Sequence, residues 1–233
     1  MFKKVALFGF LILNLAAVPA FSQDNTVSKV DSILQDYYSE NSPGVSVMIL
    51  KNGEVQISKS YGYANLEDRE AATKETNYQL ASLTGQFTAM AVMMLDDEGK
   101  ASLDQKITDV WEGLPGYCSA VTLNDLLEQS SGLPNLSYRK FYWDIKDFND
   151  IKKFLNQHKE LRYQPGEKTN SNAVNNALMA AYVEKVSGTG YRKFVENRIF
   201  EPLGMDNSSV YKGGLFSRIS NKATGYMRQD NDQ

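Results

Sequence analysis

The sequence has little of the side-chain chemistry on which many enzyme sites depend. Its 233 residues include one cysteine, Cys118, and one histidine, His158. A single cysteine excludes an intrachain disulfide, and we expect Cys118 to be a small buried apolar residue. With no Cys/His cluster the sequence offers no metal site, and we expect no cofactor. A single histidine also disfavours a Ser-His-Asp triad, and we expect His158 to be a partly exposed helix residue.

The chain also lacks excess positive charge. Its net charge is −3 and its pI is about 5.3, which argues against a nucleic-acid partner. The length allows one domain or a small pair. There is no internal repeat, low-complexity linker or clear domain boundary.

Residues 1–22 have the pattern of a secretory signal peptide. A basic start, "MFKK", precedes the apolar run "VALFGFLILNLAAVPA", and small residues follow at Ala20 and Ser22. We therefore expect cleavage after Ser22, a secreted or periplasmic protein that starts at Gln23, and no stable membrane span after processing. The alternative is a retained N-terminal anchor.

The mature chain is expected to be mixed α and β. Apolar residues at helical spacing predict a helix within 27–41, and two β-branched runs flank Asn52-Gly53, a strong signal for an antiparallel hairpin. The segment after Ser82 is apolar nearly all round, which predicts a buried helix ending near Gly99. Further helices are expected within four ranges: 121–134, 144–161, 170–188 and 191–205.

Ser82 has two interpretations. Serine is a favoured helix cap, and Ser82 begins the buried helix, so the local stretch alone favours a cap. A helix N-terminus also offers free N–H groups and a positive dipole end, which would suit a serine nucleophile.

Six segments in order bear on this choice: "PGVSVMILKNGEV", "YGYANLE", "SLTGQFTAMAVMMLDDEGKASLDQKI", "LLEQSSGLP", "QPGEKTNSN" and "IFEPLGM". Together they resemble the serine β-lactamase and penicillin-binding-protein superfamily, most closely its class C branch. The resemblance runs from about Ser28 to about Tyr226. It implies a β-lactamase-like serine hydrolase fold, in which a helix and a β-hairpin lead into a helical subdomain.

The family uses three short elements, and the resemblance carries them over only in part. Of S-x-x-K, Ser82 matches the nucleophile, but Gly85 stands where the lysine is expected. Of Y-x-N, Asn172 matches the substrate-binding asparagine, but Asn170 stands at the tyrosine position. Gln129 stands at a position often held by histidine. A K-T-G or H-x-G strand does not occur before Gln233.

We therefore expect residues 23–233 to form a partial β-lactamase-like domain, C-terminally truncated, without the last strands of its sheet. The implied activity is acyl transfer on an amide, β-lactam, D-amino-acid peptide or ester, and we expect it to be defective. The alternatives are a working hydrolase with an unusual base, a non-catalytic cell-envelope protein that binds a peptidoglycan-like peptide, and a product without function. Unpaired sheet edges would also favour self-association.

Overall fold

The chain forms two compact units in the computed structural model. The first contains the described residues up to Thr76 and those from Asn221, and the second extends from Asn77 to Ser220. The predicted signal peptide lies outside the described residues. The structure describes the following ranges: 23–35, 37–38, 41–136, 145–211 and 219–227.

The first unit is built on the predicted hairpin. Strands β1 (Val45–Lys51) and β2 (Glu54–Tyr61) pair antiparallel. Asn52 and Gly53 connect them with φ angles of 53° and 81°, a left-handed turn that these two residue types adopt readily. The hairpin prediction is therefore confirmed. A second antiparallel pair consists of β3 (Tyr63–Asn65) and β4 (Glu70–Ala71).

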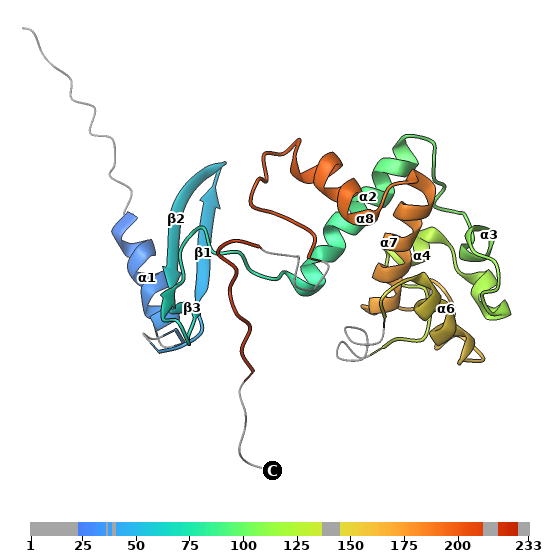
Figure 1. Ribbon diagram of the computed structural model, residues 1–233, viewed down its shortest axis with the longest axis horizontal. Coiled ribbons are helices and arrows are strands. Elements are labelled where there is room, and N and C mark those ends of the chain that lie inside the picture. The colour runs from blue at the N-terminus through green and yellow to red at the C-terminus, as the bar shows by residue number, and fades with distance from the viewer. Residues whose placement is uncertain (1–22, 36, 39–40, 137–144, 212–218, 228–233) are drawn as a thin grey trace, which may run out of the picture. The chain divides into compact units, whose positions relative to one another are not determined.

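Helix α1 (Gln23–Gln35) packs beside β2, as Figure 1 shows. Lys59 Nζ and Tyr61 Oη, both on β2, donate to the Asp31 carboxylate over 2.8 and 2.7 Å. These two hydrogen bonds, that of Lys59 first, hold the pKa of Asp31 below its usual value. They tie the helix to one face of the hairpin.

The expected apolar face of this helix is only partly buried. Val30 and Leu34 are half-buried, but Ile33 is 61% exposed and Tyr37 is 75% exposed. The prediction was wrong for these two residues because the helix ends at Gln35, before Tyr37, and only one side of it meets the hairpin.

The other face of the hairpin carries exposed apolar side chains. Met48 and Leu50 on β1 alternate with residues that face α1, and Val55 is paired with Leu50 across the turn. All three are more than half exposed. No third strand joins β1 and β2 in the described part of the chain.

The second unit is helical and surrounds α7. It contains a 3₁₀ turn (Ala81–Thr84), α2 (Gly85–Asp97), α3 (Ile107–Val110), a second 3₁₀ turn (Gly116–Ala120), α4 (Leu123–Leu127), α6 (Phe148–Asn156), α7 (Ala173–Ser187), α8 (Tyr191–Val195) and a π-helical turn (Glu196–Phe200). Helix α7 contacts α2, α4, α6 and α8.

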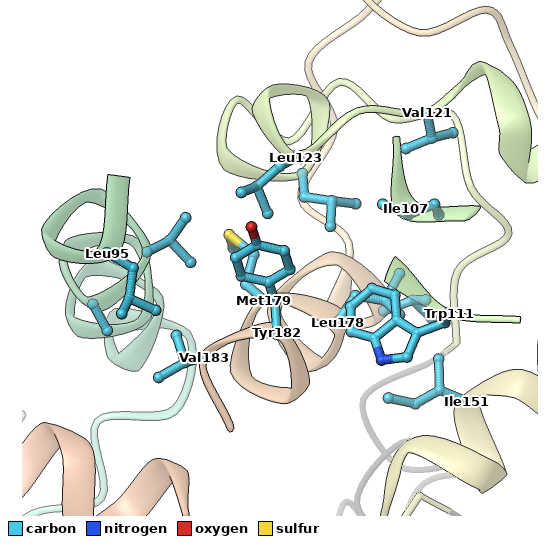
Figure 2. Close-up of a cluster of buried hydrophobic side chains, with 14 of the residues drawn as sticks. Leu95, Ile107, Trp111, Val121, Leu123, Ile151, Leu178, Met179, Tyr182 and Val183 are labelled. Atoms are coloured by element: carbon cyan, nitrogen blue, oxygen red, sulfur yellow. The ribbon is translucent and has the colours of Figure 1, made fainter. Parts of the chain in front are cut away.

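The core of this unit gathers on α7, as Figure 2 shows. Leu178, Tyr182 and Val183 are almost fully buried and lie among side chains from the surrounding elements, such as Leu95 and Trp111. Trp111 stacks on Phe148 with ring centroids 4.8 Å apart. This packing fixes α2 and α7 against each other.

Two predictions about buried residues are confirmed. Cys118 is fully buried, and burial raises the pKa of its thiol to about 12, so the group stays protonated at neutral pH. In the helix predicted within 144–161, the apolar residues at helical spacing also pack inward: Ile151 and Leu155 are buried, and Phe148, Phe154 and Leu161 contact the same core.

Helix α2 differs from its expected all-round burial. Ala91, Val92 and Leu95 are buried on one side, whereas Met90 and Met93 are 43% and 46% exposed. Leu80, just before the 3₁₀ turn, and Leu83, within it, are also exposed and add to this apolar surface. The helices of the described residues are all too short or too polar to cross a membrane.

These exposed apolar side chains generate a prediction about self-association. On the hairpin, Leu50 is 57% exposed beside an unpaired strand edge, so we expect the chain from Gln23 to dimerise or aggregate. Size-exclusion chromatography with light scattering measures this. Leu50→Lys should reduce association, because it places a charge on this apolar face. The control substitution Lys153→Gln, on the exposed surface of α6, should leave association unaltered. A monodisperse monomer of the unmodified chain would contradict the prediction.

Candidate functional site

Ser82 lies exposed in the 3₁₀ turn that leads into α2. No hydrogen bond forms to its hydroxyl within the described residues. The residues that precede the turn and the helix are Leu80 and Thr84, and neither makes a side-chain cap. The cap interpretation of Ser82 is therefore wrong, and the structure gives its hydroxyl no role in holding the fold together.

The residue before Ser82 has an unusual backbone. Ala81 has a φ of 47°, in the left-handed region, which costs an alanine about 1–2 kcal/mol. Such strained residues cluster at functional sites, where the surrounding structure holds them in place. The left-handed conformation of Ala81 sets the direction in which the chain enters the turn, where Ser82 is exposed.

Gly85 is the first residue of α2 and has ordinary helical angles, φ −54° and ψ −32°. A Cβ at this position would meet the side-chain amide of Asn176, with Oδ1 at 3.5 Å and Nδ2 at 3.6 Å. Those are ordinary van der Waals contacts, so a side chain fits here. The position predicted for the missing lysine therefore faces an uncharged amide on α7.

Gln129 connects this amide to the neighbouring loop. Its side-chain Oε1 accepts from the backbone N–H of Asn172 at 3.0 Å, and its Nε2 donates to Asn176 Oδ1 at 3.0 Å. Its backbone oxygen accepts from Asn170 N at 2.8 Å. Gln129 itself has a left-handed φ of 56°, which turns its side chain toward α7. One residue thus holds the 170–172 segment and the start of α7 together.

The same chain of amides extends into the interior. Asn175 Nδ2 donates to Gln129 Oε1 at 3.2 Å, and Ser131 Oγ donates to Asn175 Oδ1 at 2.6 Å. Ser131 Oγ also accepts from Leu133 N at 3.2 Å. We call Gln129, Ser131, Asn175 and Asn176 the amide network.

The orientations within the amide network follow from one backbone group. Because the N–H of Asn172 can only donate, the atom of Gln129 that meets it must be the oxygen. The nitrogen of Gln129 then faces Asn176, whose oxygen accepts it. This leaves Asn176 Nδ2, the nitrogen near Gly85, without a partner among the described residues. The amide beside Gly85 therefore has its oxygen occupied by Gln129 and its nitrogen available as a hydrogen-bond donor.

The chemical capacity of this arrangement is limited. An amide donates and accepts hydrogen bonds, but it does not take a proton from a serine hydroxyl. Lys100, a lysine near α2 in sequence, pairs with Glu98 at 2.8 Å. It lies past the far end of a 13-residue helix, about 20 Å away at 1.5 Å per residue. It does not supply the missing base.

The other two predicted site residues lie next to the amide network. Asn170 has an exposed side chain and is tied to Gln129 only through its backbone. Asn172 is 4% exposed and caps α7: its Oδ1 accepts from Val174 N at 2.9 Å, and its Nδ2 donates to Leu133 O at 2.9 Å. A ligand would have to share these bonds, and the substrate-binding role of Asn172 stays a prediction.

The sequence contained a sign of the amide network that was not used. Residues 170–176, "NSNAVNN", contain four asparagines, and the family motif accounts for only Asn170 and Asn172. Asn175 and Asn176 follow the cap at α7, so they lie in its first turn. In the described residues, no group of three or more His, Cys, Asp or Glu side chains is arranged to hold a metal.

Comparison with known proteins adds a family relation. The family model described as Beta-lactamase matches residues 28–225. Protein flp of Staphylococcus aureus (strain MRSA252) is 28% identical over 216 residues, covering 88% of this chain and 42% of flp. Penicillin-binding protein 4* of Bacillus subtilis (strain 168) is 31% identical over 191 residues, covering 78% of this chain and 41% of that protein.

A solved structure shows the same fold. The octameric penicillin-binding protein homologue from Pyrococcus abyssi superposes with a TM-score of 0.77 at 32% identity, covering 88% of this chain and 48% of that one. The expected β-lactamase-like fold is therefore confirmed. The chain spans less than half the length of each of these three proteins.

The free hydroxyl of Ser82 leads to a stability prediction. Ser82→Ala should change the free energy of unfolding by less than about 0.5 kcal/mol, because an exposed, unbonded group is removed. The same change at buried Ser131 should cost about 1–3 kcal/mol, because Asn175 Oδ1 and Leu133 N lose their partner. Urea denaturation measures both. Equal effects of the two substitutions would contradict this account.

The two glycines at the ends of α2 provide a matched pair. Gly85→Ala should stabilise the protein by about 0.5–1 kcal/mol, because the backbone is helical and the new Cβ has room. Gly99→Ala should destabilise it by about 1 kcal/mol, because Gly99 has a φ of 68°. Thermal unfolding compares them. A loss of stability at Gly85 would mean that the space beside Asn176 is not free.

Proposed function

The chain belongs to the beta-lactamase family, and from that premise we propose that it is a serine hydrolase relative defective in acyl transfer that binds its ligand without covalent chemistry. The ligand class is a small amide, ester, β-lactam or peptidoglycan-like peptide. We propose that it acts outside the cytoplasm, on the strength of the predicted signal peptide.

The observation that carries this proposal is the environment of Gly85. In S-x-x-K enzymes the lysine lies one turn after the serine on the same helix face. Here that place faces the side-chain amide of Asn176, with Oδ1 at 3.5 Å and Nδ2 at 3.6 Å, whose oxygen is already held by Gln129 and whose nitrogen is a neutral donor. A donor at this point suits a carbonyl or carboxylate oxygen of a ligand. It offers nothing that removes the proton of Ser82.

The size of the expected defect follows from the missing proton transfer. A serine hydroxyl is a weak nucleophile unless an adjacent base activates it. A positioned base contributes about 10²–10⁴-fold to the rate. The loss of the base alone therefore makes acylation slow compared with ligand exchange, and binding remains as the activity that the site supports.

Mass spectrometry of the intact protein tests the proposed defect. The chain from Gln23 is incubated with a fluorophosphonate and, separately, with benzylpenicillin, beside a Ser82→Ala control. We expect neither reagent to add mass to Ser82 within an hour, so that the protein and its control remain alike. Rapid modification mapped to Ser82 would show that another group activates the hydroxyl, and the proposal would be wrong.

A binding measurement tests the second half of the proposal. Addition of D-alanyl-D-alanine to ¹⁵N-labelled protein should shift the side-chain amide signal of Asn176 and the backbone signals around Ser82. Asn176→Ala should weaken that response several-fold, whereas Asn156→Ala, an amide on α6 away from the network, should not. If no signal shifts, the proposed binding role is wrong.

A further inference from the structure

An open groove of about 500 Å³ lies outside the amide network, between Pro134–Asn135 and the segment 157–162. It belongs entirely to the second unit. Neither Ser82 nor Gly85 lines it. The groove is therefore separate from the candidate site around Ser82.

The two walls of this groove are held together by backbone contacts. Arg162 N donates to Gly132 O over 2.7 Å. Gly132 has a φ of 67°, and a Cβ there would come within 2.0 Å of Tyr163 O, so only glycine permits this approach. This close approach holds the segment that ends at Arg162 next to the segment that leads to Pro134.

Asn135 anchors the other wall. Its Nδ2 donates to Ser171 O, and its Oδ1 accepts from Ala173 N, each over 3.2 Å. These bonds attach the groove to the start of α7. The groove is therefore positioned by the same helix that carries Asn176.

Among the charged side chains of the groove lining, two are cations and one is an anion. Arg162 and Lys159 make no ion pair or hydrogen bond through their side chains with any described residue. His158 Nδ1 lies 2.9 Å from Phe154 O, and because a carbonyl only accepts, this nitrogen carries a hydrogen. Glu160 is the single carboxylate in the lining. The lining thus contains two cations that have no partner among the described residues, and one anion.

We propose that this groove binds a small ligand through a carboxylate or phosphate group. An arginine guanidinium matches the two oxygens of such a group, and an adjacent ammonium adds a point charge. Arg162 supplies the first and Lys159 the second. Glu160 limits the affinity by repelling the anion.

Titration of the ¹⁵N-labelled chain with two probes, inorganic phosphate and succinate, tests the proposal at constant ionic strength set with sodium chloride. We expect saturable shifts at residues 157–162 and at Asn135 with at least one probe. Tighter binding of phosphate would identify a phosphate ligand, and tighter binding of succinate a carboxylate ligand. If neither probe shifts these signals beyond the effect of chloride, the proposal is wrong.

Three substitutions separate the groove from general surface charge. Arg162→Gln and Lys159→Gln should each weaken binding of the better probe at least five-fold, and Glu160→Gln should tighten it. Lys153→Gln removes the same charge from exposed α6 surface outside the groove and should change the affinity less than two-fold. Equal weakening by Lys153→Gln and Lys159→Gln would show that only net charge matters, which would overturn the assignment.

Discussion

The bonds of Gln129 are the constraint on which the candidate site depends. Its side chain accepts from Asn172 N and Asn175 Nδ2 and donates to Asn176, while its backbone oxygen holds Asn170. Gln129 therefore holds Asn170 and Asn172, which the family resemblance assigns to the site, and Asn176, which lies beside Gly85. Because buried amides are costly to leave unpaired, these bonds favour one arrangement, in which Asn176 Nδ2 has no partner among the described residues.

This constraint explains how the fold could persist with the defect in acyl transfer that we propose. The core on α7 is apolar and independent of the residue at position 85, so a glycine there leaves the packing of Leu178 and Tyr182 intact. The space that a lysine side chain at position 85 would enter is bordered by Asn176. The side-chain oxygen of Asn176 already accepts a hydrogen bond from Gln129. The proposed loss of the base is thus compatible with a stable fold.

Features that depend on local sequence were predictable. Asn52-Gly53 requires left-handed angles at two successive residues, which determines the hairpin, and the stripe of Ile151 and Leu155 determines the inner face of α6. Cys118 was expected in the interior because the sequence offers it no partner for a disulfide or a metal. In each case a few neighbouring residues decide the outcome.

Features that depend on distant contacts were not predictable. The exposure of Met90 and Met93 depends on which side of α2 meets α7, and Ser82 fails to cap because a strained Ala81 and a 3₁₀ turn precede the helix. The amide network joins residue 129 to residues 172–176, a pairing that no local pattern specifies. The groove at Arg162 likewise depends on the close approach of Gly132 to Tyr163.

The central claim is that no protein group acts as a base for Ser82. The most direct measurement is the rate of Ser82 modification by a fluorophosphonate over several days, followed by peptide mass spectrometry from pH 5 to pH 9. The account predicts a slow rate that rises tenfold per pH unit throughout, as expected when only hydroxide removes the proton. A rate that levels off above an inflection between pH 6 and pH 8 would reveal a titrating base in the protein and contradict the claim.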